Sequence, residues 1–415
     1  MLNTPQRSSL IFLSSFASTS SLCLSAGFQL QERSTSGLGR AFAGEASIAE
    51  DASSIATNAA SMLLLDKWSA SAGLSYIAPN IDISGTFIPT GSSKELHTSD
   101  NKAAQAALIP YAYFSNKLSD DLALGLALHS RFGLSTDYSD DFLATSQANL
   151  SEIVTYYISP KIAYRLNEQW SLGAGFDAIF AEGRLSTSMS SVSPAAGASI
   201  VDVEGDCWTY GFNLGTLYQI NTSTRFGLAY YSKVDLALDG HLTTDVLPIS
   251  TSQIEALVEQ ELPQSIELSG HHQINDQWTI LSSITWTNWS VFEELTIQSA
   301  AQDFAKRENW KDTFRIALGS TYSYDDKWTL RAGLAFDESP IRSKEFRTLR
   351  IPDSDRYWLS AGASYQIDSS YSADFGYSFI LADTVDIQET DSTGTFRGEV
   401  SGNVHIIGLS INGSF

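Results

Sequence analysis

Apolar residues alternate with small or polar residues along most of the chain, from Trp68 to Phe415. Within 328–337, Trp, Leu, Ala, Leu and Phe hold the even positions, while Thr, Arg, Gly, Ala and Asp hold the odd ones. The segments 170–180 and 371–379 repeat this alternation. Successive side chains of a strand point to opposite faces, so a period of two predicts strands with one apolar face. We therefore expect an all-β chain of antiparallel strands.

Several features favour a transmembrane β-barrel over a soluble β-sandwich. The strand signals run for about ten residues, which is the length that spans a bilayer at a tilt. Short turns at one end, long loops at the other and aromatic residues at strand ends are typical of outer-membrane barrels. Polar pairs followed two residues later by a Trp predict tight turns at 167–168, 275–276 and 325–326. Longer Ser- and Thr-rich connections are expected at 186–200, 241–262 and 298–309.

The two ends of the chain carry signals of their own. Residues 1–25 combine Arg7, a short apolar stretch and small residues before Ala26, a pattern that predicts a secretory signal peptide. The last strand alternates and ends on the aromatic Phe415, which resembles the assembly signal of outer-membrane barrels. We expect a multi-pass protein of the bacterial outer membrane. Its expected partners include the barrel assembly machinery and outer-membrane lipid, including lipopolysaccharide.

Residues 26–67 differ from the rest because they are rich in Ala, Ser and Gly and show no strand alternation. A barrel built from residues 68–415 is wider than the eight-stranded size that side chains alone can fill. Something must therefore close its lumen, and residues 26–67 can do so as short helices. The expected organisation is a signal peptide at 1–25, a plug or hatch at 26–67 and a transmembrane barrel at 68–415.

The composition narrows the class of function. With 47 Asp and Glu against 25 Lys and Arg, the net charge of −22 leaves no basic surplus to neutralise a nucleic acid. No run of 18 apolar residues occurs, so no membrane-spanning helix is expected. The six His residues lack the spacing of a metal site, and no G-x-S-x-G motif is present. We therefore expect no metal, no cofactor and no enzyme activity. After signal cleavage Cys207 is alone, so no disulfide within the chain is expected.

The N-terminal motifs resemble the hatch of FadL-type long-chain fatty acid transporters, the OmpP1/FadL/TodX family. The similar stretches are Ala26-Gly-Phe-Gln-Leu-Gln31, Ser36-Gly-Leu-Gly-Arg-Ala-Phe-Ala-Gly-Glu45 and Ile48-Ala-Glu-Asp-Ala52. Further similarity at Asp355-Arg-Tyr-Trp-Leu-Ser-Ala-Gly362 extends the resemblance along the mature chain. The resemblance implies a fourteen-stranded outer-membrane barrel with an N-terminal plug. It also implies passive uptake of long-chain fatty acids, with lateral exit through the barrel wall.

A fatty acid carboxylate taken out of water must be paired or hydrogen-bonded, so an acidic carrier needs a local group of cations. Residues 306–356 hold eleven of the 25 basic residues. The resemblance implies that Lys306, in Ala305-Lys-Arg-Glu308, binds the ligand carboxylate. The family's second cation aligns with Thr187 in this chain. We expect Arg184, three residues earlier, to compensate for it.

The resemblance also implies a gate and a lateral opening. Phe28 resembles a phenylalanine that inserts into the ligand pocket and moves when the site empties. Asn58-Ala59-Ala60 stands where the family has Asn-Pro-Ala in the hatch, and the loss of proline frees the dihedral angle that it would fix. Gly125 lies in the expected third strand, where the family's strand kinks inward, and a glycine inside a strand often marks a bend.

Two other functions stay open at this stage. Within the family, the ligand can be another hydrophobic compound, such as an aromatic hydrocarbon, for which a charged anchor matters less. From a different class, the chain can be a general porin for small polar solutes. Ligand copurifying near Lys306 would favour the fatty acid, whereas high ion conductance in planar bilayers would favour the porin.

Overall fold

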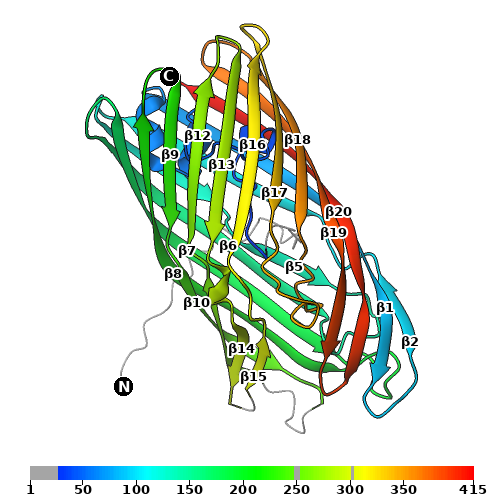
Figure 1. Cartoon of the computed structure of the whole chain (residues 1–415). Coiled ribbons are helices and arrows are strands. Elements are labelled where there is room, and N and C mark those ends of the chain that lie inside the picture. Colours follow the sequence, from blue (N-terminus) through cyan, green and yellow to red (C-terminus); the bar gives the residue numbers. More distant parts are fainter. Residues whose placement is uncertain (1–26, 247–252, 301–302) are drawn as a thin grey trace, which may run out of the picture.

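In the computed structural model, which describes residues 27–246, 253–300 and 303–415, the chain forms a closed antiparallel β-barrel (Figure 1). The expected signal peptide, residues 1–25, lies outside the described residues. The described residues contain twenty strand segments: β1 (Trp68–Pro89), β2 (Leu96–Asp100), β3 (Ala107–Lys117), β4 (Leu122–His129), β5 (Gly133–Asp137), β6 (Leu150–Arg165), β7 (Trp170–Ser188), β8 (Ser199–Gln219), β9 (Thr224–Tyr231), β10 (Val234–Thr243), β11 (Ile254–Leu262), β12 (Ser265–Gln273), β13 (Trp278–Thr287), β14 (Glu294–Ser299), β15 (Phe304–Arg307), β16 (Thr313–Ser323), β17 (Trp328–Asp337), β18 (Arg356–Gln366), β19 (Tyr371–Thr390) and β20 (Gly394–Ser414).

Six barrel strands are interrupted, so each appears as two consecutive segments. These pairs are β2 with β3, β4 with β5, β9 with β10, β11 with β12, β13 with β14, and β15 with β16. The described segments therefore make up fourteen barrel strands. The barrel closes where β20 pairs with β1, from Ser414 opposite Ser69 to Gly394 opposite Pro89. This architecture confirms the predicted all-β transmembrane barrel.

The tight turns share one local mechanism. At each turn an Asn or Asp side chain accepts hydrogen bonds from the backbone N–H groups two and three residues later. Asn167 accepts from Gln169 and Trp170, both at 2.9 Å. Asp325 accepts from Lys327 at 2.8 Å and from Trp328 at 2.7 Å. The predicted spacing of polar pair and Trp is therefore the sequence of a self-capping turn, and it places each Trp at the first position of a strand.

The outer wall is apolar, and an aromatic girdle borders it at the short-turn end. Rings from adjacent strands lie against one another there: the Trp170 and Tyr218 centroids are 4.5 Å apart, and those of Trp278 and Tyr322 are 4.6 Å apart. Exposed apolar side chains cover the wall beyond the girdle, among them Leu172, Phe212, Leu268, Leu318 and Leu359. Such a band flanked by aromatic residues fits the interface of a bilayer. In the described residues, no helix has the length and apolar character needed to cross a membrane.

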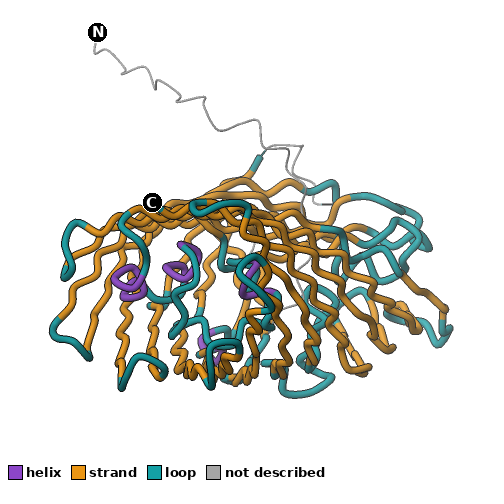
Figure 2. The backbone as a smooth tube through the Cα atoms, turned by 90° about the horizontal axis from the view of Figure 1, so that it is seen from above, coloured by secondary structure: helices purple, strands orange, loops and turns teal. Residues whose placement is uncertain are grey.

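Residues 27–67, called the hatch segment below, lie inside the barrel at the short-turn end (Figure 2). The hatch segment contains α1 (Thr35–Leu38), η1 (Ala52–Ala56) and η2 (Ala59–Leu64), and a further short helix, η3 (Trp289–Val291), follows β13. Glycines on the inner wall let its backbone approach closely. A Cβ atom at Gly215 would collide with the side chain of Asn58, and one at Gly333 with the carbonyl of Arg40. The hatch segment and the wall therefore pack together without a gap.

Buried ion pairs fasten the hatch segment to the wall. Arg40 pairs with Glu45 at 2.9 Å and with Glu50 at 2.7 Å. Glu50 in turn pairs with Arg331 of β17 at 2.9 Å. These two cations lower the pKa of Glu50 to about 2, even though burial alone would raise it. The carboxylate of Glu50 is thus held in its charged form between an arginine of the hatch segment and one of the wall.

The long-loop end differs from the sequence expectation in two places. Residues 241–262 were expected as one connection, but β11 already begins at Ile254. Residues 298–309 were also expected as a connection, but 304–307 form β15. Acidic residues occupy the outer face of β11, so its alternation lacks the usual apolar exterior. These strands extend past the apolar band, where an outer face can be charged.

Candidate ligand-binding site

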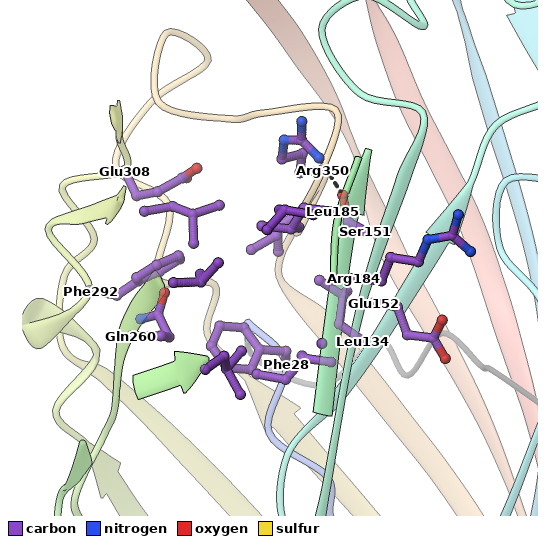
Figure 3. A pocket seen from close by; sticks show the side chains of 17 residues that line it. Phe28, Leu134, Ser151, Glu152, Arg184, Leu185, Gln260, Phe292, Glu308 and Arg350 are labelled. Atoms are coloured by element: carbon purple, nitrogen blue, oxygen red, sulfur yellow. Dashed lines mark hydrogen bonds between the residues drawn. The ribbon is translucent and has the colours of Figure 1, made fainter. Parts of the chain in front are cut away.

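A cavity that is partly open to solvent lies beside the start of the hatch segment, with Phe28 in its wall (Figure 3). Its walls are mainly apolar side chains from the inner faces of several strands, among them Leu134, Leu185, Val203, Leu238, Val258 and Leu295. Glu308 and Arg350 are the charged residues at one end, and Glu152 and Arg184 also belong to its lining. A cavity that is apolar along its length and charged at one end suits an amphiphilic or hydrophobic ligand.

Phe28 forms part of the cavity wall, as predicted for the ligand pocket. Its ring is 3% exposed and packs against four aromatic rings. The centroid distances are 4.9 Å to Trp289, 5.8 Å to Phe292, and 6.0 Å each to Phe132 and Trp310. The edge-to-face geometry of most of these pairs is favourable for aromatic rings. Phe28 therefore occupies an aromatic cluster beside the space where an acyl chain would lie.

Lys306 stands close to this cavity but its charge already has a partner. Its ammonium group lies 2.6 Å from the carboxylate of Glu389, and the Lys306 side chain is 36% exposed. Glu389 is anchored further by the N–H of Leu349, which donates to it at 2.8 Å. Lys306 does not line the cavity, whereas Glu308, two residues later, does. The role of Lys306 as the carboxylate ligand stays a prediction.

Arg350 is a second cation in the lining of the cavity, beside Arg184, and the sequence did not single it out. Its Nη1 donates to the carbonyl of Leu150 at 3.2 Å and to the hydroxyl of Ser151 at 3.0 Å. These bonds tie a loop residue to the start of β6 and hold the guanidinium at the cavity. Arg350 belongs to the basic group at 306–356, but nothing in the local pattern separates it from its neighbours. Only the course of the loop at 338–355 brings it to the pocket.

Glu308 is the second charged group of the cavity and was also missed. It is 1% exposed, and burial together with the nearby Glu389 raises its pKa to about 8, against an opposing effect of Lys306. At neutral pH this carboxyl group is therefore largely protonated. The polar end of the cavity then carries less negative charge than its sequence suggests.

Arg184 belongs to the lining of the cavity, and its role as a ligand-binding cation stays a prediction. Its guanidinium points away from the cavity (Figure 3) and forms two hydrogen bonds with Asp202, at 2.9 and 2.7 Å. The Arg184 side chain is 46% exposed. Thr187, the position that it was expected to replace, is 8% exposed. Side chains three positions apart in a strand point to opposite faces, so those of Arg184 and Thr187 lie on opposite faces of the wall.

The bend expected at Gly125 lies farther along the chain. β4 pairs with β3 and β6 in unbroken register through Gly125, opposite Ser115 and Lys161. The strand is interrupted between His129 and Gly133 instead. Gly125 faces the hatch segment, since a Cβ atom there would lie 2.5 Å from the sulfur of Met62. Its glycine makes room for the hatch segment rather than for a kink.

The interruption leaves part of the wall unpaired. β3 pairs with β4 only from Ala112 onward, so within the described residues no ladder joins Ala107–Tyr111 to β5. An isolated bridge between Ala104 and Thr136 restores contact nearer the long-loop end. We call the unpaired stretch between Ala107–Tyr111 and β5, on the short-turn side of that bridge, the wall opening.

The start of the hatch segment takes the vacant place inside the wall opening. The N–H of Leu30 donates to the carbonyl of Arg131 at 2.7 Å, and that of Gly133 donates to the carbonyl of Phe28 at 2.9 Å. Gln29 and Phe132 form the bridge between these bonds. The same three-residue segment therefore contacts both the cavity, through Phe28, and the interrupted strand.

Asn58, Ala59 and Ala60 lie deep in the hatch segment, each at most 1% exposed. The Asn58 amide donates to the carbonyl of Ala46 at 2.7 Å and to that of Thr216 at 3.0 Å. Its side-chain oxygen accepts from the N–H of Ala60 at 3.0 Å and caps η2. These bonds fix the turn without a proline. A gating role for the three residues stays a prediction.

Within the described residues, no group of three or more His, Cys, Asp or Glu side chains is arranged to hold a metal ion. The cavity combines a mainly apolar wall with Arg184, Arg350, Glu152 and Glu308, and the Lys306–Glu389 pair lies nearby.

Known proteins are similar to this chain in sequence and fold. A family profile described as "Outer membrane protein transport protein (OMPP1/FadL/TodX)" matches residues 16–415. A "Long-chain fatty acid transport protein" of Salmonella typhi is 36% identical over 421 residues, covering 94% of each chain. The crystal structure of a Pseudomonas aeruginosa FadL homologue has a TM-score of 0.85 at 26% identity, covering 94% of this chain and 100% of that one.

A toluene transporter, TodX of Pseudomonas putida, has a TM-score of 0.72 at 18% identity, covering 91% of this chain and 97% of that one, and shows the fold alone. The family profile and the 36% identical relative span nearly the whole chain. The chain therefore belongs to the OMPP1/FadL/TodX family of outer-membrane proteins that transport hydrophobic compounds.

Proposed function

We propose that this protein carries out passive uptake of long-chain fatty acids across the bacterial outer membrane. The observation that carries the proposal is the cavity, which is apolar along its length and has Arg350 at its polar end. An acyl chain gains about 0.8 kcal/mol for each CH₂ group that it buries. The carboxylate needs a cation or donor when it leaves water, and Arg350 with the nearby Lys306 offers both.

The proposed path follows the start of the hatch segment. Phe28 leaves the aromatic cluster as the acyl chain occupies the cavity. Because residues 28–30 also pair with residues 131–133, this movement frees the inner side of the wall opening. The ligand then leaves sideways into the bilayer. Outside the opening the wall presents Leu108, Leu128 and Ile158, which are 47%, 40% and 42% exposed, so an acyl chain meets no aqueous barrier there.

Replacing Arg350 by Gln tests the head-group assignment. A charged hydrogen bond contributes about 1.5–3 kcal/mol, so the affinity for oleate should fall by about ten- to a hundredfold. Lys306→Gln should cost less, because Lys306 is already paired with Glu389. Arg184→Gln is the matched control and should bind oleate normally, because the Arg184 guanidinium is paired with Asp202 and points away from the cavity. Oleate affinity that is unchanged in Arg350→Gln and Lys306→Gln would count against the proposal.

The pairing of Lys306 with Glu389 favours a second candidate, an uncharged ligand such as an aromatic hydrocarbon. A site whose lysine is already neutralised needs no ligand charge. Competition between oleate and methyl oleate for the purified protein separates the two. A fatty acid transporter should prefer oleate, and Arg350→Gln should abolish that preference. Equal binding of acid and ester by the unaltered protein would favour the uncharged ligand.

A further inference from the structure

A second cation, Arg131, is buried in the interruption between β4 and β5 and lacks an anionic partner. Its residue is 2% exposed. The guanidinium lies over the ring of Tyr231, 3.3 Å from the centroid, and its Nη2 donates to the hydroxyl of Ser265 at 3.2 Å. Its Nη1 is buried and has no hydrogen-bond partner among the described residues. No carboxylate of the described residues forms an ion pair with it.

The neighbour of Arg131, His129, is unsatisfied as well. Its residue is 4% exposed, and neither ring nitrogen has a hydrogen-bond partner within the described part of the chain. The ring lies against Tyr157 and Tyr113, with centroids 5.5 and 6.0 Å away. Two adjacent buried side chains at the same break in a strand thus present unused polar atoms toward the lumen.

The surrounding charges do not compensate Arg131. Lys161 adds a second cation near Tyr231, and its ammonium group donates to the side-chain oxygen of Asn213 at 2.9 Å. The carboxylate of Asp177 accepts from the amide of Asn213 at 2.9 Å and from the hydroxyl of Ser159. Asn213 thus links Lys161 to Asp177, which leaves the charge of Arg131 unbalanced.

An unbalanced buried guanidinium is costly, because burial removes water without supplying a counter-charge. The Tyr231 ring offsets part of this cost through a cation–π contact. It does not satisfy the free Nη1 donor. The site therefore favours any anion small enough to reach it, and a carboxylate suits a guanidinium well.

The position of Arg131 indicates which carboxylate reaches it. Its carbonyl accepts from Leu30, and the next residue, Phe132, packs on Phe28, which lines the cavity. On the other side, residues 130–132 border the wall opening. The backbone of Arg131 therefore lies between the cavity and the opening, where the start of the hatch segment now sits, and its guanidinium extends into the lumen to Tyr231 of β9 and Ser265 of β12.

We propose that Arg131, with His129 beside it, is a second, transient site for the carboxylate of a fatty acid on its way from the cavity to the wall opening. This inference rests on the proposed function. The carboxylate accepts from Arg131 Nη1 after residues 28–30 move aside. The head group then passes from one arginine to another instead of crossing the apolar interior unpaired, while the acyl chain leads through the opening.

The test compares Arg131→Gln with the unaltered protein in cells lacking other fatty acid transporters. Oleate uptake should fall by about tenfold, the effect of losing one charged hydrogen bond from a buried anion. Uptake of hexadecane, which has no charge, should stay unchanged. The affinity of the purified protein for oleate should change by less than about twofold, because the cavity retains Arg350. Arg131→Lys should restore most of the uptake.

Arg315 offers a matched control. It is also a buried arginine beside an aromatic ring, 5.1 Å from the centroid of Trp358, and it donates to the carbonyl of Ala41 in the hatch segment at 2.8 Å. Arg315→Gln should leave the ratio of oleate to hexadecane uptake unchanged. Assembly is judged by heat-modifiable migration on gels. If Arg131→Gln fails to assemble, Arg131→Met replaces it in the test, because it keeps the packing on Tyr231.

Three results would overturn the second site. One is normal oleate uptake by an assembled Arg131 variant. Another is an equal loss of oleate and hexadecane uptake, which assigns Arg131 a purely structural role. In both cases an intact effect of Arg350→Gln leaves the proposed function standing. The third is an unaltered protein that neither binds nor takes up oleate, and it overturns the proposed function together with the second site.

Discussion

At the scale of single residues, the polar end of the cavity holds an unusual balance of charge. Lys306 pairs with Glu389, and Arg350 faces the cavity beside a Glu308 whose pKa is raised to about 8. While Glu308 is protonated, the summed charge of these four side chains is positive, and an incoming carboxylate is attracted. Once Glu308 ionises, the four side chains together are neutral, and the carboxylate of Glu308 repels the ligand.

Oleate binding should therefore weaken as the pH rises through about 8. Glu308 is neutral below this value and negative above it, so affinity should drop by about tenfold between roughly pH 6.5 and 9.5. In Glu308→Gln the side chain stays neutral, and the drop should disappear. Titration of the purified protein with oleate across this range measures it. A drop of the same size in both proteins would contradict the role of Glu308.

Residue-scale prediction succeeded where a residue's surroundings are local and failed where they are not. Phe28 follows from a continuous motif, and the structure places it at the cavity. The choice of Arg184 as a substitute for Thr187 did not consider the parity of side chains along a strand, and the Arg184 guanidinium pairs with Asp202. Arg350 could not be predicted, because it lies in a loop without periodicity. Only the course of that loop brings it to the strands that it contacts.

At the scale of elements, residues 28–30 behave as a short strand that replaces the missing partner of the interrupted strand. The three residues are held by two backbone hydrogen bonds to the interrupted strand, by a bond from Thr287 to the Gln29 side chain and by the packing of Phe28 and Leu30. A segment with so few bonds can exchange while the barrel stays intact. Its departure would change the cavity and the wall opening together.

A disulfide across this pairing should stop transport. Gln29 and Phe132 are opposite residues of an antiparallel bridge, a separation that a disulfide can span. In a Cys207→Ser background, Gln29→Cys with Phe132→Cys should block oleate uptake under oxidising conditions. Dithiothreitol should restore it. Either single cysteine should remain insensitive to dithiothreitol, and full uptake by the oxidised pair would show that residues 28–30 need not move.

The strands themselves were largely predictable, because alternation and self-capping turns are local properties. Their interruptions were not. The break at 130–132 contains no proline or glycine that marks it. It exists because the hatch segment supplies replacement hydrogen bonds at Leu30 and Phe28, and that contact joins residues about a hundred positions apart.

At the scale of the whole molecule, we expect the hatch segment to close the lumen, and buried charge holds it in place. Glu50 joins Arg40 to Arg331, and its pKa is lowered to about 2 from an ordinary value of 4.5. A depressed pKa contributes stability that is complete above the ordinary value and is lost as the pH falls through the depressed one. The seal should therefore hold at neutral and mildly acidic pH.

In planar bilayers, the protein should conduct poorly from neutral pH down to about 4, and conductance should rise only as the pH approaches about 2. Arg331→Met removes one of the two cations that hold Glu50, so its conductance should begin to rise at a higher pH. Lys327→Met, an exposed lysine next to the start of β17, is the control. High conductance of the unaltered protein at neutral pH would favour a general porin.

The six interrupted strands divide the barrel into two tiers with separate tasks. Below the interruptions the hatch segment packs against the wall. Above them the cavity is framed partly by the shorter segments β5, β10, β11 and β14 and partly by the uninterrupted strands β6, β7 and β8. The long-loop side of the barrel can change shape around a bound ligand, while the short-turn side keeps the outer membrane impermeable. Selection on ligand preference and selection on impermeability can then act on different parts of one chain, so the long-loop end is free to diversify without making the membrane leak.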